Sequence, residues 1–190
     1  DLCPGRYNGP QIAAKFLEQY YPENERPNVR LIDIAAGTGR VGRELLDLGF
    51  HKIDALEPSD GMLQIAKQQQ LYQEYYLESI GTTKTSISDD VYDCLVISGG
   101  MGEGHIPTKA LNEMIRIVKP VVFFLPGGLI CIVMREEYLT VVSEYAGKLE
   151  NYMHDLQEQQ LWEQISRTII PNYSFQKNGV VFMYKVLPTN

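Results

Sequence analysis

The chain has 190 residues, of which 44% are hydrophobic and 22% are charged, and its formal net charge is −7 at pH 7. This composition is typical of a soluble globular protein, and the length is that of one domain with a core of useful size. The acidic balance argues against a dedicated nucleic-acid binder, because such proteins normally carry a basic face.

Neither a membrane span nor a signal peptide is visible in the sequence. The longest apolar run, residues 118–134, is broken by one lysine, two prolines and two glycines, whereas a membrane helix needs about 20 apolar residues. The first residue is Asp1 rather than Met, so we expect residues upstream of it. The cysteines Cys3, Cys94 and Cys131 form no C-x-x-C pair, which predicts neither a disulfide framework nor a zinc site. Buried thiols at Cys94 and Cys131 fit a reducing cytoplasm.

Predicted helices and strands alternate along the chain. Apolar residues at helical spacing predict helices over residues 11–20, over 41–48, after an N-cap at Ser59, after Pro107, and over 136–160. Short apolar runs predict strands over residues 29–34, 51–56, 75–77, 91–98, 129–134, 166–175 and 180–186. We therefore predict an α/β fold with one Rossmann-like domain over residues 1–190. Its seven-stranded, mostly parallel sheet has helices on both faces and ends in an antiparallel hairpin around residues 176–179.

One stretch, residues 31–48, combines a strand, a glycine turn and a helix. Its segment Ala35–Gly39 has only small side chains, so the backbone can approach a ligand closely. The N–H groups at the start of the following helix favour a polar or anionic ligand. Gly37, Gly39 and Gly42 satisfy G-x-G-x-x-G, the dinucleotide fingerprint. The stretch indicates a nucleotide site, and the alternative is a glycine turn without a ligand.

A carboxylate follows the second predicted strand. Glu57 stands where it could accept both hydroxyl groups of a ribose whose other end lies over the glycine turn. The alternative is a solvated acid at the end of a strand. The glycine turn upstream favours the ribose role.

The order of the motifs resembles a known enzyme family. The sequence carries, in this order, IAAGTG directly after Asp33, ALEPSDGML, VYDCLVISGG, a predicted helix ending in Lys119-Pro120, and Gly127-Gly128 before a strand. In this arrangement it resembles class I S-adenosylmethionine-dependent methyltransferases. The motif Glu57-Pro58-Ser59 is the more telling part, because dinucleotide dehydrogenases do not usually carry it. More narrowly, Asn8-Gly9-Pro10, AAGTGRVG, Gly104-His105-Ile106-Pro107 and the closing hairpin resemble the methyltransferase-like proteins of the Williams–Beuren syndrome region 27 type.

This resemblance implies S-adenosylmethionine as the cofactor and assigns residues to each part of it. The implied contacts are Asp33, Ala35, Ala36, Gly37, Thr38 and Gly39 against the methionine part; Glu57, followed by Pro58, on the ribose; Met62 on the adenosine; Ser79 and Ile80 beside the adenine; Ser98, Gly99 and Gly100 beneath the sulfonium; and Tyr7 closing over the cofactor.

The sequence departs from the family pattern in three places. Many relatives carry an Asp beside the adenine, whereas here Glu78 lies one position before Ser79. Relatives usually read Lys-Pro-Gly-Gly directly, whereas here the apolar segment Val121–Pro126 separates the two pairs. That insertion could lengthen the fifth strand or form a flap. The missing start could also remove a lid helix that such enzymes fold over the cofactor.

His105 is the candidate general base, because it follows the fourth strand on the expected cofactor side of the sheet. The alternative is a loop histidine that caps or packs against the next helix. Glu103 could orient it or be solvated, and Tyr173 and Arg135 could face an acceptor pocket or serve packing and surface charge. His51 and His154 lack plausible partner ligands, so we predict no metal site. Trp162 is predicted to anchor the end of the last helix in the core.

We expect methyl transfer to an unidentified acceptor, a small molecule or a protein rather than nucleic acid. The Asp/Asn-Pro-Pro-Tyr signature of amino-methylating nucleic-acid enzymes is absent after the fourth strand, where Ser98–Met101 stands. Two other functions stay open from the sequence. The G-x-G-x-x-G pattern also suits a nicotinamide-dependent oxidoreductase, although no Tyr-x-x-x-Lys pair of the short-chain type is present. A cofactor-binding protein without transferase activity is the third possibility.

Overall fold

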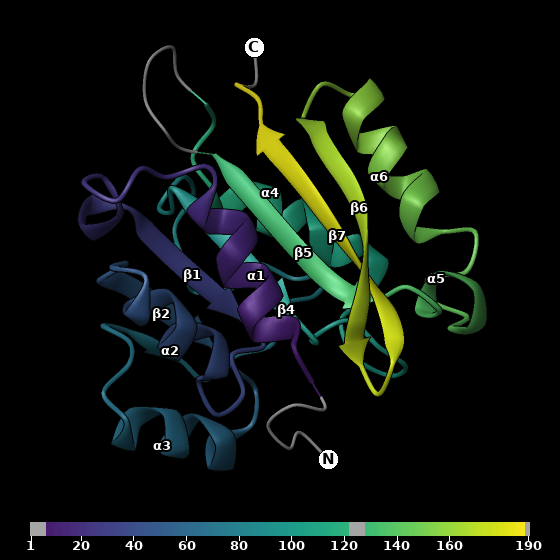
Figure 1. The fold of residues 1–190 in the computed structure, drawn as a ribbon. Coiled ribbons are helices and arrows are strands. Elements are labelled where there is room, and N and C mark those ends of the chain that lie inside the picture. Colours follow the sequence, from purple (N-terminus) through teal and green to yellow (C-terminus); the bar gives the residue numbers. More distant parts are fainter. Residues whose placement is uncertain (1–6, 122–127, 189–190) are drawn as a thin grey trace.

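The computed structural model of the chain describes residues 7–121 and 128–188. Seven strands form one sheet in the order β3-β2-β1-β4-β5-β7-β6 (Figure 1). The first five of these in the sheet are parallel, and β7 is antiparallel to both β5 and β6. The strands are β1 (Arg30–Ile34), β2 (Lys52–Leu56), β3 (Tyr75–Tyr76), β4 (Cys94–Ser98), β5 (Leu129–Arg135), β6 (Trp162–Ser174) and β7 (Lys177–Val186). The predicted α/β fold with a mostly parallel sheet and a C-terminal hairpin is confirmed.

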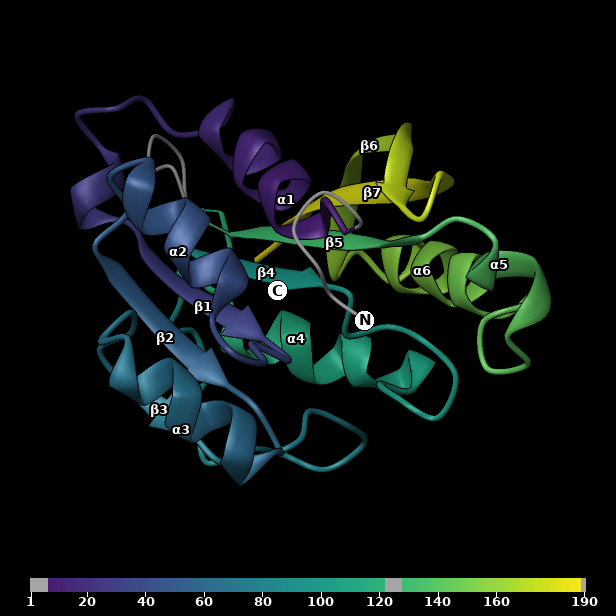
Figure 2. The same ribbon diagram turned by 60° about the horizontal axis from the view of Figure 1, so that its bottom comes forward.

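Helices cover both faces of the sheet. They are α1 (Gly9–Glu18), α2 (Arg40–Asp47), α3 (Asp60–Gln68), α4 (Leu111–Ile117), α5 (Tyr138–Val141) and α6 (Leu149–Glu158), with short 3-10 helices η1 (Arg26–Asn28) and η2 (Thr108–Ala110). Figure 2 shows α1 on one side of β4 and β5, with α4 and α6 on the other. Ser59 caps α3 as predicted, because its side chain accepts a hydrogen bond from the Met62 N–H.

The core is divided by the sheet into two apolar clusters. Because successive strand residues point to opposite faces, Leu31 packs with α1, α2 and α3, whereas Ile32 packs with α4 and α6. All five residues of β4 are buried. Burial on both faces explains why the central strands are continuous apolar runs rather than alternating ones. Cys94 and Cys131 lie in this core, fully buried, as predicted.

The predicted single helix over residues 136–160 is wrong. The structure has α5 and α6 there, separated by a turn in which Gly147 adopts a positive φ of 65°. The buried Tyr145 lies in this turn, and its hydroxyl accepts a hydrogen bond from the Gly102 N–H (3.1 Å) and donates one to the Ile106 carbonyl (2.7 Å). Burial raises the pKa of Tyr145 to about 12, so the phenol stays protonated. The break in the helix therefore fixes the loop that follows β4.

The hairpin begins earlier and turns more tightly than predicted. Strand β6 starts at Trp162 rather than residue 166, and the connection is the two-residue loop Phe175–Gln176 rather than residues 176–179. The start was missed because β6 is the edge strand, so polar residues on its outer face stay in water. Trp162 stacks on Tyr184, with ring centroids 3.9 Å apart, and its indole donates a hydrogen bond to the Met153 carbonyl of α6.

Two sequence predictions fall on residues that the structure leaves out. The insertion Val121–Pro126 lies outside the described residues except for Val121, whose N–H donates to the Val186 carbonyl at 2.9 Å. Cys3 also lies outside them. Within residues 7–121 and 128–188, no helix is both long and apolar enough to cross a membrane.

Candidate functional site

A cavity of about 650 Å³ opens at the carboxyl ends of the parallel strands. Its size is that of a typical small-molecule site, and its position is where ligands bind in open α/β sheets. Most of the predicted cofactor residues line it, namely Tyr7, Ala35, Ala36, Gly37, Thr38, Glu57, Pro58, Met62, Ser79, Ile80, Ser98, Gly99 and Gly100. Asp33 and Gly39 are not among its lining residues.

The glycine turn between β1 and α2 has two glycines with different surroundings. At Gly37, with φ +57°, an added Cβ would meet only the Met62 sulfur, at 3.9 Å. At Gly39, with φ +93°, an added Cβ would lie 2.5 Å from Leu71 Cδ1. Gly37 therefore leaves space toward the cavity, whereas Gly39 allows the turn to pack tightly on the residues after α3.

Asp33 lies beneath the turn and not in the cavity wall. Its side chain is buried, and the Tyr72 hydroxyl donates a hydrogen bond of 2.6 Å to Oδ2. Burial raises the pKa of Asp33 to about 7, although the bond from Tyr72 acts in the opposite direction. An added Cβ at Gly42 would lie 2.5 Å from the Tyr72 ring, so this glycine makes room for the ring. Sequence reasoning missed the bracing role because Tyr72 is distant in the chain.

Glu57 is held in a fixed orientation at the cavity wall. Its Oε2 accepts a hydrogen bond from the Gly37 N–H (2.9 Å), and its Oε1 accepts one from the Ser59 N–H (2.8 Å). The residue is 6% exposed. Each carboxylate oxygen has two acceptor sites, so both oxygens can accept a further bond from a ligand. The carboxylate thus links the glycine turn to the end of β2 and keeps acceptor capacity.

Hydroxyl groups from three distant segments meet at the centre of the cavity. The Tyr7 hydroxyl is 3.0 Å from Ser98 Oγ, and the Tyr173 hydroxyl donates to Tyr7 at 3.5 Å. An added Cβ at Gly99 would lie 2.4 Å from the Tyr7 hydroxyl, so this glycine leaves room for the phenol. Burial raises the pKa of both Tyr7 and Tyr173, so both phenols stay protonated.

Arg40 lines the cavity but was not predicted from the sequence. It is the first residue of α2, and its guanidinium lies 5.3 Å from the centre of the Tyr7 ring and bonds to the Tyr7 carbonyl at 3.4 Å. Its position directly after the glycine turn is a signal that could have found it. The contact ties the segment before α1 to the start of α2.

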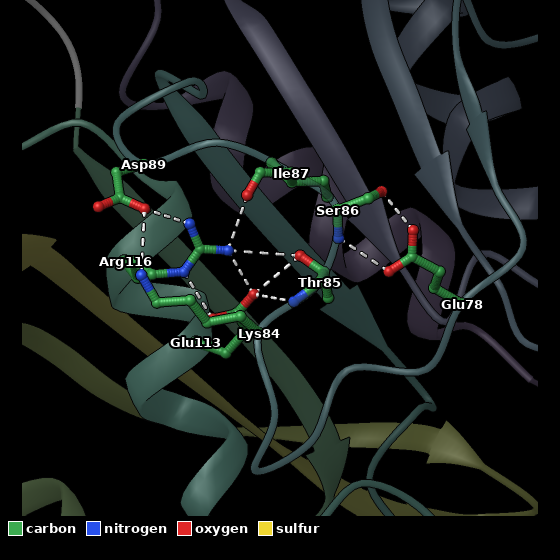
Figure 3. A network of polar contacts seen from close by, with 8 residues as sticks. All are labelled: Glu78, Lys84, Thr85, Ser86, Ile87, Asp89, Glu113 and Arg116. Carbon is green, nitrogen blue, oxygen red and sulfur yellow. Dashed lines mark hydrogen bonds and ion pairs between the residues drawn. The ribbon is translucent and has the colours of Figure 1, made fainter.

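A polar network anchors the loop that follows β3, which carries Ser79 and Ile80 (Figure 3). The Arg116 guanidinium of α4 bonds to Glu113 (2.5 Å), to the Ile87 carbonyl (2.8 Å) and to Asp89. Glu113 also accepts from the Thr85 N–H (2.7 Å). Burial alone would raise the pKa of Glu113, but the bonds from Arg116 and Thr85 lower it.

Glu78 closes the other end of this loop. It accepts hydrogen bonds from the N–H of Ser86 at 3.0 Å and from the Ser86 hydroxyl. Its carboxylate is thus engaged within the loop, and it is Ser79 and Ile80 that line the cavity.

The loop after β4 brings His105 to the opposite end of the cavity. His105 is exposed and lines the cavity, whereas Glu103 is exposed and does not. An added Cβ at Gly102 would lie 3.4 Å from His105 Nδ1 and 3.5 Å from Tyr138 Cε2, so these two rings border the same small space. Arg135 and Tyr173 line this end as well. Met101, Tyr138 and Phe175 also line it and were not predicted from the sequence.

The described residues contain no group of three or more His, Cys, Asp or Glu side chains placed to hold a metal ion. The donor set of the cavity instead suits an organic ligand. A fixed carboxylate at Glu57, open backbone at Gly37 and the apolar side chains of Met62 and Ile80 fit a ribose, a polar tail and a flat base, respectively.

Comparisons with known proteins find similarity to methyltransferases. Residues 31–121 match the family model described as a methyltransferase domain. Human methyltransferase-like protein 27 is 29% identical over 163 residues, which are 86% of this chain and 62% of that protein. A demethylmenaquinone methyltransferase of Renibacterium salmoninarum is 34% identical over 94 residues, which are 50% of this chain and 38% of that protein. The chain therefore spans less than two thirds of these relatives.

The fold also has solved counterparts. A structure described as a putative S-adenosylmethionine dependent methyltransferase from Listeria monocytogenes superimposes with a TM-score of 0.66 at 12% sequence identity. The match covers 94% of this chain and 100% of that chain. At this low identity the likeness concerns the fold, which is the arrangement of sheet and helices seen in Figure 1.

Proposed function

We propose that the chain is a class I S-adenosylmethionine-dependent methyltransferase and that it transfers a methyl group from S-adenosylmethionine to a small-molecule acceptor. One observation carries the proposal: the Glu57 carboxylate is bonded to the Gly37 N–H at the wall of a cavity of ligand size. The acidic balance disfavours nucleic acid as the acceptor, and the bacterial relatives are named for a small acceptor, demethylmenaquinone.

The residues of the cavity can hold the cofactor at three points. Glu57 would accept hydrogen bonds from the ribose hydroxyls, and Met62 and Ile80 would pack against the adenosine. Tyr7 would cover the middle of the ligand, since its ring is held by Ser98 on one side and Arg40 on the other. Asp33 would contribute indirectly by bracing the turn through Tyr72.

The bound cofactor would supply an electrophilic methyl group on a good leaving group, so the protein's task is to position the acceptor and exclude water. A general base is needed only when the acceptor must lose a proton. His105 lines the acceptor side of the cavity and could take that proton on its imidazole. The match to a methyltransferase domain favours this function over the nicotinamide-dependent alternative, which shares the glycine turn.

Binding is tested first, by calorimetric titration with S-adenosylhomocysteine and, separately, with NADH. We expect a heat of binding with S-adenosylhomocysteine and none with NADH. Absence of binding heat with S-adenosylhomocysteine at millimolar concentration would contradict the proposal.

Transfer is tested by incubation with labelled S-adenosylmethionine and fractionated cell extract. We expect label in the small-molecule fraction, whereas label in protein or RNA would contradict the acceptor class. Binding of the cofactor without transfer to any fraction would favour a protein that lacks transferase activity. If His105 is the base, His105→Ala should lower turnover by about 10²–10⁴-fold and leave the Kd of S-adenosylhomocysteine unchanged.

A further inference from the structure

The two ends of the cavity differ in their charged residues. The end beside the glycine turn contains both the Glu57 carboxylate and the Arg40 guanidinium. The other end, over β5 and the hairpin, is lined by Met101, Ile106, Arg135, Tyr138, Tyr173 and Phe175, among others. Among the described residues that line this second end, no carboxylate is present, and Arg135 carries the only permanent charge. A ligand there meets a cation in mostly apolar surroundings.

Two hydrogen bonds hold the Arg135 guanidinium in place and leave some of its N–H donors for a ligand. Arg135 is the last residue of β5, and its side chain is 23% exposed. One nitrogen bonds to Glu137 Oε1 at 3.0 Å, and another bonds to Ser174 Oγ at 3.3 Å. A guanidinium has five N–H donors, so these contacts use two of them within the described residues. The remaining donors have the planar arrangement that pairs with a carboxylate.

Glu137 does not depend on Arg135 alone for its counter-charge. Its second oxygen lies 3.1 Å from Lys177 Nζ, so each carboxylate oxygen has its own cation. The contacts to Lys177 and Arg135 both lower the pKa of Glu137. An anionic ligand could therefore share Arg135 with Glu137, or displace it, while Glu137 stays paired with Lys177.

One aromatic ring lies over this cation, and a second aromatic side chain lines the same cavity. The Arg135 guanidinium lies 5.2 Å from the centre of the Tyr138 ring. Phe175 lines the cavity and is 48% exposed. It occupies a two-residue hairpin loop with a φ of +48°, a conformation that favours Gly or Asn and that strains a bulky side chain. A strained, half-exposed aromatic residue beside a cavity points to a ligand-contacting role.

We propose that this end of the cavity binds the methyl acceptor, and that the acceptor is a small compound with an aromatic or apolar body and a carboxylate group held by Arg135. The inference rests on the proposed methyl transfer and names its substrate class. The carboxylate is the anchor and not the reacting atom, because hydrogen bonds to Arg135 engage the lone pairs that would attack. A carboxylate fits better than a phosphate group, because a dianion would repel the neighbouring Glu137 more strongly.

The test uses the whole chain saturated with S-adenosylhomocysteine and two probes that differ in size by one non-hydrogen atom. The probes are 4-hydroxyphenylacetate and its neutral counterpart 4-hydroxyphenethyl alcohol, titrated with detection by ligand-observed NMR. We expect the carboxylate to bind at least about tenfold more tightly than the alcohol, since one bidentate charge-assisted pair distinguishes them. Equal binding of the two probes would overturn the proposal. Tighter binding of 4-hydroxybenzylphosphonate than of the carboxylate would overturn the choice of carboxylate.

Matched variants separate recognition from structure. Arg135→Gln should abolish the preference for the carboxylate, and Arg135→Lys should keep part of it, because charge remains but the planar fork is lost. The control is Arg167→Gln, because Arg167 also pairs with a glutamate (Glu150, 2.6 Å) and lies over a ring (Phe182, 5.7 Å) but does not line the cavity. This control should keep the full preference. Loss of the carboxylate preference in Arg167→Gln, or its persistence in Arg135→Gln, would refute the role of Arg135 as the carboxylate-binding residue.

Failure of this inference is distinguishable from failure of the proposed function. The Kd of S-adenosylhomocysteine is measured for each variant, and we expect it within threefold of the original for Arg135→Gln and Arg135→Lys. The probe titrations are repeated without S-adenosylhomocysteine. Absence of S-adenosylhomocysteine binding would contradict methyl transfer, whereas intact cofactor binding without any carboxylate preference would contradict only the acceptor class.

Discussion

Replacing Glu57 by glutamine tests the central contact of the site. The carboxylate accepts two backbone N–H groups, from Gly37 and Ser59, at 2.9 and 2.8 Å. A glutamine side chain has one acceptor oxygen, so at least one of these N–H groups would face an amide N–H₂ instead. Hydrogen bonds to a charged group contribute about 1.5–3 kcal/mol each. We expect the free energy of unfolding of Glu57→Gln to fall by about that amount in urea denaturation.

The same change should weaken cofactor binding separately. If Glu57 accepts the ribose hydroxyls, losing one charge-assisted bond costs about 1.5–3 kcal/mol of binding free energy, which is a Kd roughly 10–140 times higher. Calorimetry with S-adenosylhomocysteine at 25 °C, well below the unfolding transition, measures this effect on folded protein. The Glu57→Gln variant could lose stability as expected and still bind S-adenosylhomocysteine with a Kd within threefold of the original. That result would refute the ribose role and make Glu57 a purely structural residue.

Asp54→Asn is the matched control. Asp54 lies on β2, the strand that Glu57 directly follows, is fully buried, and accepts hydrogen bonds from Arg30, Tyr92 and the Glu74 N–H, but it does not line the cavity. Its replacement should lower the free energy of unfolding to a similar degree and leave the Kd of S-adenosylhomocysteine unchanged. A rise in Kd in this control would show that any loss of stability weakens binding.

Three further predictions follow from residues around the turn and the loop. Burial raises the pKa of Asp33 from its ordinary 3.8 to about 7, so the native state keeps a proton that the unfolded chain releases. The free energy of unfolding should therefore fall between about pH 4 and 7, by at most about 4 kcal/mol, and urea denaturation of Asp33→Asn should lack this slope. Gly42→Ala would place a Cβ 2.5 Å from the Tyr72 ring and should cost about 1–3 kcal/mol of stability through overpacking. Gly49→Ala meets no neighbour within 4 Å and should cost only the strain of its φ of +92°, about 1–2 kcal/mol. An unchanged free energy of unfolding in Gly42→Ala would contradict the packing argument. Arg116→Gln should speed hydrogen exchange of the loop after β3 more than that of β4, and uniform acceleration would indicate global destabilisation instead.

The sequence was most informative where the structure is local. The strand, the glycine turn and the helix over residues 31–48 are contiguous, and hydrophobic periodicity together with glycine spacing marks them directly. The place of Glu57 at the cavity wall was predictable for the same reason, because it directly follows the next strand. The position of Asp33 was not, because its partner Tyr72 follows α3 and meets it only after the sheet forms. Hydrophobic periodicity shows that Asp33 lies in a strand, but it does not show which residue donates a hydrogen bond to the Asp33 carboxylate.

The other end of the cavity was harder to predict because its residues are far apart in the chain. Arg135 and Tyr173 were named as candidates from their positions after strands, but Tyr138 and Phe175 were not. The predicted long helix obscured the position of Tyr138, because the helix actually ends at Val141 and a new one starts only at Leu149. The loop of the hairpin also lacked the Asn-Gly or Asp-Gly pair that usually marks such turns.

The two ends of the cavity are formed by different segments of the chain, so substitutions at one end need not affect the other. Consecutive strand–loop–helix units build the end that contains Gly37 and Glu57, and a hydrogen bond from the Gly37 N–H to the Glu57 carboxylate ties them together. The loop after β4, the end of β5 and the hairpin build the other end, and each joins the sheet separately. On the proposed acceptor site, a substitution at Arg135 or Phe175 would therefore alter acceptor contacts without changing the hydrogen bond between Gly37 and Glu57. If Glu57 binds the cofactor as proposed, a change there should impair methylation of every acceptor, because all acceptors would share that cofactor.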